Sequence, residues 1–167
     1  MDEIINKVAN SKLVVIDLED FYPEGPRVVF DIKNWLFMEL VLKEKDFREK
    51  AKNHDWSQYK GAYVALNCSS DAIVPGWAYL LLTSYLTPFA KKVVTGSLVD
   101  MENILFSEII LRKDFSIYID LPVIIKGCSN KPVPGNAYTL LIQKLQPVAK
   151  SIFYGEACSS VPIYKRK

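Results

Sequence analysis

The sequence predicts an α/β fold in which helices cover the faces of a mostly parallel sheet. Short apolar runs that fit buried strands alternate with longer segments of helical periodicity. Strands that alternate with helices form βαβ crossovers, which join parallel strands. Half of the 167 residues are hydrophobic and 24% are charged, as in ordinary globular proteins. We therefore expect a single α/β domain over residues 1–167.

The first elements are marked by apolar runs and turn signals. The run LVVI at residues 13–16 predicts a short buried strand. The turn signal PEGP at residues 23–26 precedes a second predicted strand, RVVFDI at residues 27–32. The charged residues 43–53 are predicted to be helical, and the apolar residues 63–67 to form the third strand.

The remaining elements continue the alternation. Pro75 precedes a helix predicted at residues 76–89, because the first turn of a helix tolerates the missing amide proton of proline. Leu105, Ile109 and Arg112 stand at helical spacing within the next predicted helix, residues 99–112. A further helix is predicted at residues 135–147. The remaining strands are predicted at residues 92–95, 122–126 and 151–154.

The clearest internal signal is self-similarity at an offset of 59 residues. Residues 74–96 (VPGWAYLLLTSYLTPFAKKVVTG) align without gaps with residues 133–155 (VPGNAYTLLIQKLQPVAKSIFYG), and 12 of these 23 positions are identical. The predicted repeat covers about residues 55–96 and 114–155, each reading as turn, strand, cysteine loop, helix and strand. Duplication explains the pattern, and repeated units that bury repeated cores give it a purely architectural reading as well.

Three cysteines follow predicted strands, and each precedes a serine. Cys68, Cys128 and Cys158 all lie shortly before a Val-Pro pair. The carboxyl ends of parallel strands share one edge of a sheet, where ligands bind, so we expect the three thiols to meet there. Thiolates bind zinc or iron, and a fourth ligand would come from water, a substrate, a carboxylate or a partner. The predicted function is a metal-binding or iron–sulfur-assembly accessory protein whose cofactor is zinc, iron or an iron–sulfur cluster.

Polar residues beside the cysteines are candidates for a second shell around the metal. They are Ser69, Asp71, Ser129, Glu156 and Ser159. His54, the single histidine, is predicted to cap a helix end rather than to bind metal. No catalytic residue is identified. No Cys-x-x-Cys pair is present, so the usual zinc signature is absent.

Two other functions fit the same cysteines. Cys68 and Cys128 precede helix N-termini, whose partial positive charge favours thiolate, so a thiol redox protein or a cysteine-nucleophile enzyme is one alternative. Buried free cysteines often act only as small hydrophobic side chains. With such structural cysteines, the chain would be a non-catalytic protein-interaction module.

Charge and hydropathy limit the partners. A formal net charge of +2 is too small to indicate nucleic-acid binding, and no apolar run reaches membrane-spanning length. Residues 1–12 are polar and lack the apolar core of a signal peptide, so we expect a cytoplasmic protein with reduced thiols. A protein partner or a homodimer is the expected kind of assembly. The basic residues 165–167 are interpreted as a frayed, solvated tail.

Several motifs resemble those of a family of small bacterial proteins from the Bacteroidota that is described only as a domain of unknown function. The motifs are DIKNWLF, LKEKDFREKAKNHDWSQY, LNCSSDAIVPGWAY, IKGCSNKPVPGNAY, KLQPVAKS and CSSVPIYKRK. The resemblance covers nearly the whole chain and implies an intracellular protein with no assigned activity. It also implies genes that lie near those of iron–sulfur cluster assembly, which by association favours the metal-linked prediction.

Overall fold

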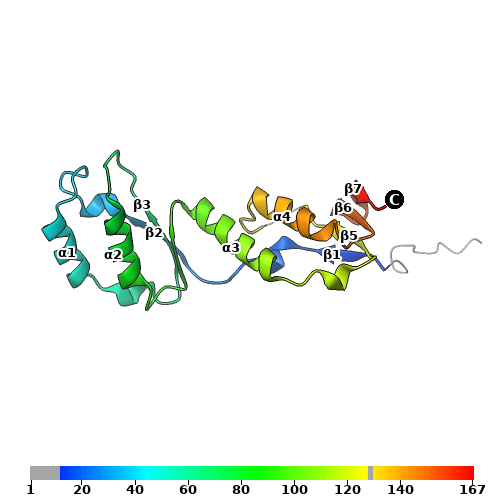
Figure 1. Cartoon of the computed structure of the whole chain (residues 1–167), viewed down its shortest axis with the longest axis horizontal. Helices are drawn as coiled ribbons and strands as arrows, with labels where there is room; N and C mark the ends of the chain where they lie inside the picture. Colours follow the sequence, from blue (N-terminus) through cyan, green and yellow to red (C-terminus); the bar gives the residue numbers. More distant parts are fainter. Residues whose placement is uncertain (1–11, 128–129) are drawn as a thin grey trace, which may run out of the picture. The chain divides into compact units, whose positions relative to one another are not determined.

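The computed structural model describes residues 12–127 and 130–167. These residues form a mixed α/β structure whose sheets are mostly parallel, as the sequence predicts (Figure 1). The strands form two sheets instead of the expected one. The chain divides into two compact units, which we call the middle unit, Glu24–Glu102, and the outer unit, made of the described residues up to Pro23 together with Asn103–Lys167. The single domain stays a prediction.

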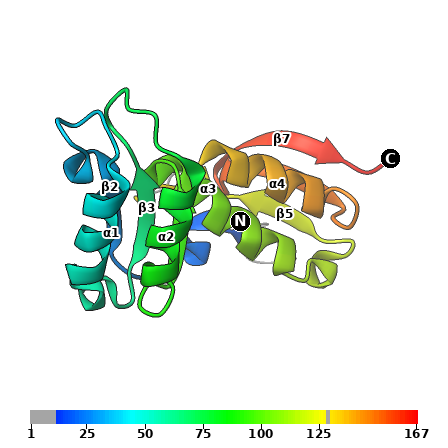
Figure 2. The same ribbon diagram turned by 60° about the vertical axis from the view of Figure 1, so that its left-hand side comes forward.

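The middle unit is a three-stranded parallel sheet in the order β2-β3-β4. Its strands are β2 (Arg27–Asp31), β3 (Tyr63–Asn67) and β4 (Lys92–Thr95). Its helices are α1 (Glu44–Asn53), α2 (Gly76–Leu86) and the short 3-10 helices η2 (Ile32–Trp35) and η3 (Trp56–Tyr59). Figure 2 shows α1 and α2 on the same face of this sheet. This is the arrangement expected when two crossovers of the usual right hand follow one another in the same direction along the sheet.

The outer unit is a four-stranded sheet in the order β1-β5-β6-β7, parallel except for β7. Its strands are β1 (Val14–Ile16), β5 (Pro122–Ile125), β6 (Ser151–Glu156) and β7 (Ser159–Lys165). Its helices are α4 (Gly135–Leu145), η1 (Leu18–Phe21), η4 (Ser116–Tyr118) and most of α3 (Leu98–Arg112), within which the division between the units falls.

Strand β7 corrects the interpretation of the C-terminal residues as a frayed tail. It pairs antiparallel with β6, and the Arg166 amide donates a hydrogen bond of 3.0 Å to the Lys150 carbonyl. The guanidinium of Arg166 forms an ion pair with Asp120 and donates a hydrogen bond to the Val148 carbonyl. Pro162 hid the strand from sequence analysis, because proline is tolerated only in edge strands such as this one.

Each unit has its own hydrophobic core between its sheet and its helices. The middle core gathers Phe47 of α1, Leu66 of β3 and Leu82 of α2, all fully buried. The outer core joins residues of the sheet to α3 and α4, including Phe106, Ile125 and Leu141. The two cores explain why the strands form two sheets.

Corresponding elements of the two units begin 59 residues apart. Strand β3 begins at Tyr63 and β5 at Pro122, helix α2 at Gly76 and α4 at Gly135, and strand β4 at Lys92 and β6 at Ser151. Because of this spacing, residues of one unit can be compared with residues of the other.

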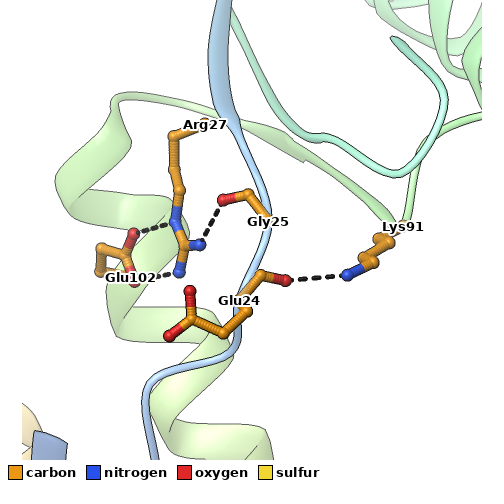
Figure 3. A network of polar contacts seen from close by, with 5 residues as sticks. All are labelled: Glu24, Gly25, Arg27, Lys91 and Glu102. Atoms are coloured by element: carbon orange, nitrogen blue, oxygen red, sulfur yellow. Dashed lines mark hydrogen bonds and ion pairs between the residues drawn. The ribbon is translucent and has the colours of Figure 1, made fainter.

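A polar network joins the beginning and the end of the middle unit (Figure 3). Arg27 donates hydrogen bonds to both carboxylate oxygens of Glu102, at 2.7 and 3.3 Å, and to the Gly25 carbonyl at 2.8 Å. Lys91 donates to the Glu24 carbonyl at 2.8 Å. A side chain at Gly25, whose φ is +144°, would come within 2.9 Å of the Tyr63 ring, so only glycine fits there.

Candidate functional site

The structure places two of the three cysteines. Cys68 directly follows β3, and its half-buried Sγ lies 3.4 Å from the Ser70 hydroxyl. Cys158 is exposed in the turn between β6 and β7. Cys128 and Ser129 lie outside the described residues, as do most of the N-terminal residues on which the absence of a signal peptide was predicted. Within residues 12–127 and 130–167, no group of three or more His, Cys, Asp or Glu side chains is arranged to hold a metal ion.

The described second-shell candidates do not gather around a thiol. Ser69 instead binds Asp31, to which it donates hydrogen bonds from its amide at 3.1 Å and from its hydroxyl at 2.5 Å. Asp71, Glu156 and Ser159 are exposed. The three-cysteine site therefore stays a prediction, without a cluster of these side chains to support it in the described part of the chain.

His54 is the C-cap residue of α1, at the helix end where the sequence places it. Its Nε2 is 3.0 Å from the Tyr59 hydroxyl and 3.2 Å from the side-chain amide nitrogen of Gln58. Four aromatic rings surround it, with centroids 4.6 to 5.9 Å from the imidazole: Trp56, Trp35, Tyr59 and Phe30. The predicted position at the helix end is thus confirmed, and the imidazole makes its hydrogen-bond contacts with Tyr59 and Gln58.

Burial keeps this aromatic cluster neutral. Desolvation lowers the pKa of His54, and the nearby Asp55 carboxylate offsets this only in part. Burial also raises the pKa of the Tyr59 hydroxyl, and the charge of Asp55 adds to the effect. Because an amide nitrogen only donates, Nε2 acts as an acceptor toward Gln58, which fits the neutral imidazole.

Two hollows lie on either side of Trp35 in the middle unit. The first hollow has a volume of about 180 Å³ and is lined by Phe30, Asp31, Asn34, Trp35, His54 and Tyr59. The second hollow has a volume of about 290 Å³ and is lined by Trp35, Leu36, Phe37, Met38, Lys43, Asp46 and Lys50. We call these two hollows and their rim the Trp35 surface. Concave, aromatic-lined surfaces with a few polar groups are typical of binding sites.

The rim of the second hollow is a tight turn with an unfavourable backbone. The Leu40 amide donates to the Phe37 carbonyl at 3.1 Å, and Met38 and Glu39 between them have φ values of 49° and 61°. Positive φ at both central residues defines a type I′ turn, which normally requires Asn or Gly. The turn nevertheless exposes apolar side chains, since Phe37 is 50% and Met38 75% exposed.

Asp31 is part of the wall of the first hollow, and its carboxyl group is ionised. Burial by itself raises the pKa of the Asp31 carboxyl, but hydrogen bonds from Ser69 and from the Lys33 amide outweigh it and hold the pKa below its usual range. Asp31 also forms no ion pair within the described residues. The charge of Lys33 also lowers the pKa of Asp31, but as an interaction without an ion pair, so a carboxylate that no cation binds directly lies at the wall of an aromatic hollow.

The corresponding aspartate of the outer unit has a cation. Asp17 follows β1 and caps η1 through the Glu19 amide at 2.9 Å, as Asp31 caps η2 through the Lys33 amide at 3.0 Å. The ammonium of Lys126, which follows β5, binds Asp17 at 2.9 Å. Burial raises the pKa of Asp17, but the Lys126 and Glu19 bonds outweigh it, and the Asp17 carboxylate in turn raises the pKa of Lys126.

Sequence reasoning missed the Trp35 surface except for His54. The surface is assembled from three segments, and only the density of aromatic residues in FDIKNWLF and HDWSQY signals it in the sequence. A charged neighbour such as Asp31 gives no signal of its own, because its partners Ser69 and Lys33 are fixed only by the fold.

The chain was compared with known proteins. A family described as "Protein of unknown function (DUF2480)" matches residues 2–166. No curated protein and no solved structure shows a significant match. None of the helices formed by the described residues is long and apolar enough to cross a membrane.

Proposed function

We propose, from the premise that the chain belongs to the DUF2480 family of unknown function, that it is a binding module that recognises a partner protein through the Trp35 surface. One observation carries the proposal: Phe37 and Met38 are exposed on a turn with two non-glycine residues at positive φ. Strained backbone persists only where the surrounding structure holds it, and such strain concentrates at functional sites.

The surroundings of the turn favour recognition over packing. Exposed apolar side chains beside a hollow are typical of sites that bury an anchor residue of a partner. Lys43 lies 3.5 Å from the centroid of the Phe37 ring, and Lys50 donates a hydrogen bond of 3.4 Å to the Trp35 carbonyl. The first contact orders the Phe37 ring and the second the Trp35 backbone before a partner arrives, which lowers the entropic cost of binding.

A site-specific crosslinker tests the proposal in cells that naturally produce the protein. A photoreactive phenylalanine analogue replaces Met38 in one variant and Leu80 in another, because these residues of the same unit are 75% and 73% exposed. We expect one discrete adduct, identified by mass spectrometry, at position 38 and none at position 80. Trp35→Ala should abolish that adduct, whereas serine at all three cysteines should leave it intact.

Two outcomes would refute the interaction proposal. Equal crosslinking at positions 38 and 80 would mean that exposure alone determines capture. Loss of the adduct in the triple serine variant, with far-UV circular dichroism unchanged, would show that recognition depends on the cysteines rather than on the Trp35 surface.

A second candidate is the metal-linked function, an accessory protein of iron–sulfur assembly that binds zinc, iron or a cluster through Cys68, Cys128 and Cys158. It is supported by the position of Cys68 directly after β3 of the middle unit and of Cys158 two residues after β6 of the outer unit, since ligands bind at the carboxyl ends of parallel strands. Metal analysis of anaerobically purified protein tests it. Stoichiometric metal that is lost in each Cys→Ser variant supports the function, and absence of metal in the wild type rejects it.

The thiol-enzyme alternative shares these residues and needs one reactive thiolate. Alkylation rates measured against pH distinguish it from the metal-linked function, because three slow, ordinary thiols would exclude it. We further propose that residues 55–96 and 114–155 arose by duplication and that the protein is cytoplasmic. The common spacing of 59 residues supports the duplication.

A further inference from the structure

We propose that the first hollow of the Trp35 surface receives an organic cation, the ammonium group of lysine or of a free amine, or a guanidinium group, with Asp31 as its counter-charge. This inference rests on the proposed function and names the ligand chemistry of the same surface. The partner protein would present the basic side chain to the first hollow and an apolar side chain to the second.

The walls of the hollow have the chemistry that recognises organic cations. Phe30, Trp35 and Tyr59 surround it, and ring faces attract cations through their negative quadrupole. The rings support one another, since Phe30 packs edge-on against Trp35 at 5.0 Å between centroids. A pre-formed set of rings needs little reorganisation when a cation enters.

The size of the hollow suits a side-chain head group. Its volume of about 180 Å³ is several times the roughly 30 Å³ that one water molecule occupies in the liquid. It is smaller than the roughly 300–1,000 Å³ of pockets that enclose drug-sized ligands. A single ammonium or guanidinium group with its nearest methylene groups is therefore the matching ligand.

The outer unit has a lysine beside its strand-end aspartate at a place where the middle unit has an uncharged residue. Lys126 follows β5 and places its ammonium on Asp17. Asn67 holds the corresponding place in the middle unit, in register with Asp31, and it carries no charge. The buried Asn67 Oδ1 has no hydrogen-bond partner among the described residues. The middle unit thus combines a carboxylate on which Lys33 acts without forming an ion pair with a buried amide oxygen that has no donor among the described residues.

Titration of the purified full-length protein tests the inference. The probes are n-butylammonium, the neutral analogue n-butanol and a blocked Ala-Lys-Ala tripeptide, with binding followed by tryptophan fluorescence and by chemical shifts. We expect saturable binding of the cations at least about tenfold tighter than that of butanol, a factor equivalent to roughly 1.4 kcal/mol. Binding of both cations shows that the charged group suffices, and binding of the tripeptide alone identifies a basic peptide as the source.

Three variants locate the site. Asp31→Asn and Trp35→Ala should each weaken cation binding by about tenfold or more. Asn67→Lys should supply the middle unit with its own ammonium, as Lys126 does for Asp17, and should block external cations while circular dichroism stays unchanged. Asp17→Asn is the matched control. The Asp17 carboxylate is already paired with Lys126, so this substitution should leave the affinity for cations unaltered.

The result that would overturn the inference is equal affinity for butylammonium and butanol, or an affinity for cations that survives both Asp31→Asn and Asn67→Lys. Such a result leaves the crosslinking test of the Trp35 surface standing, since an apolar anchor in the second hollow would still give an adduct at position 38. Conversely, amine binding without any adduct would retain the cation site and reject the partner protein.

Discussion

Each unit has an aspartate at the end of its first strand, and the carboxylates of these two residues have different partners. In the outer unit, Asp17 is neutralised by Lys126 of the neighbouring strand end. In the middle unit, Asp31 is held by neutral hydrogen-bond donors from Ser69 and forms no ion pair within the described residues. An internal ion pair uses the carboxylate of Asp17, whereas the carboxylate of Asp31, on which Lys33 acts without an ion pair, can accept a charged hydrogen-bond donor from a ligand. The difference supports the proposal that the middle unit carries the recognition surface.

Aromatic residues follow the same division. In the middle unit, the rings of Phe30, Trp35, Trp56 and Tyr59 pack around His54. In the outer unit, the contact next to the corresponding 3-10 helix is the single pair Phe115–Tyr118, with centroids 5.9 Å apart, as far as the described residues show. Similar backbones thus support an aromatic hollow in one unit and an ordinary core in the other.

The largest expected effect tests whether the two cores are equivalent. Leu82 of α2 and Leu141 of α4 stand 59 residues apart, and both are fully buried. Replacing either with alanine should lower the free energy of unfolding by about 2.7–5 kcal/mol, since each leaves a cavity of the same kind. Urea denaturation followed by far-UV circular dichroism measures both losses. Losses that differ by more than twofold would show that the cores pack differently.

A smaller loss is expected at the ion pair of the middle unit. Glu102→Gln removes the charge that faces Arg27, and the two side chains are only 8% and 10% exposed. Breaking a buried pair costs roughly 3–5 kcal/mol, and we expect about 2–3 kcal/mol because glutamine keeps one hydrogen bond. Glu44→Gln is the control, since the exposed pair Arg48–Glu44 should contribute under about 0.5 kcal/mol. Equal losses in the two variants would show that the network of Figure 3 is not a stabilising clamp.

Substitutions of the two strand-end aspartates, Asp17 and Asp31, should differ in how strongly salt changes their cost in free energy of unfolding. Asp17→Asn breaks the ion pair with Lys126 and should cost about 1 kcal/mol at low ionic strength and less at about 1 M salt, where the Debye length is roughly 3 Å. Asp31→Asn removes bonds to neutral donors and the attraction of Lys33, which forms no ion pair with Asp31, so its cost should depend less on salt than that of Asp17→Asn. Denaturation of both variants at low and high salt measures the contrast. A salt dependence at Asp31 as large as that at Asp17 would mean that a cation is bound directly to the Asp31 carboxylate.

The helices and strands were predicted well because their signals lie in residues that are close together in the sequence. The strands at residues 63–67 and 92–95 have the predicted bounds. Helix α2 ends at Leu86 rather than at residue 89, and α4 at Leu145 rather than at residue 147. Pro88 and Pro147 explain both differences, because proline cannot continue a helix.

Non-local features could not be read from the sequence. The division into two sheets depends on strand order, which no local period encodes. The sequence placed Cys68 and Cys158 after strands, but their convergence requires that same order and stays a prediction. The Trp35 surface joins η2, η3 and the end of α1, and its aspartate differs from Asp17 only through a residue on another strand, Asn67 instead of Lys126.

The smallest expected effect concerns the protonation of His54. Burial lowers its pKa below the unfolded value of about 6.5, so the folded state prefers the neutral imidazole. Stability is unaffected above that value and falls as the pH drops from about 6.5 toward the folded pKa, because the unfolded chain then binds more protons. Asp55 stays ionised in this range, since its bonds with Ser57 lower its pKa, and Tyr59 stays neutral.

His54→Gln removes this proton-binding group while keeping a polar side chain beside Tyr59. The wild type should lose more unfolding free energy than this variant between about pH 7.5 and about pH 5.5. Butylammonium should also bind the wild type more weakly at the lower pH, because a cationic imidazole would then line the first hollow. Identical pH dependence of stability in the two proteins would show that the imidazole reaches solvent freely. Unchanged amine affinity would place the cation away from His54, on the Asp31 side of the hollow.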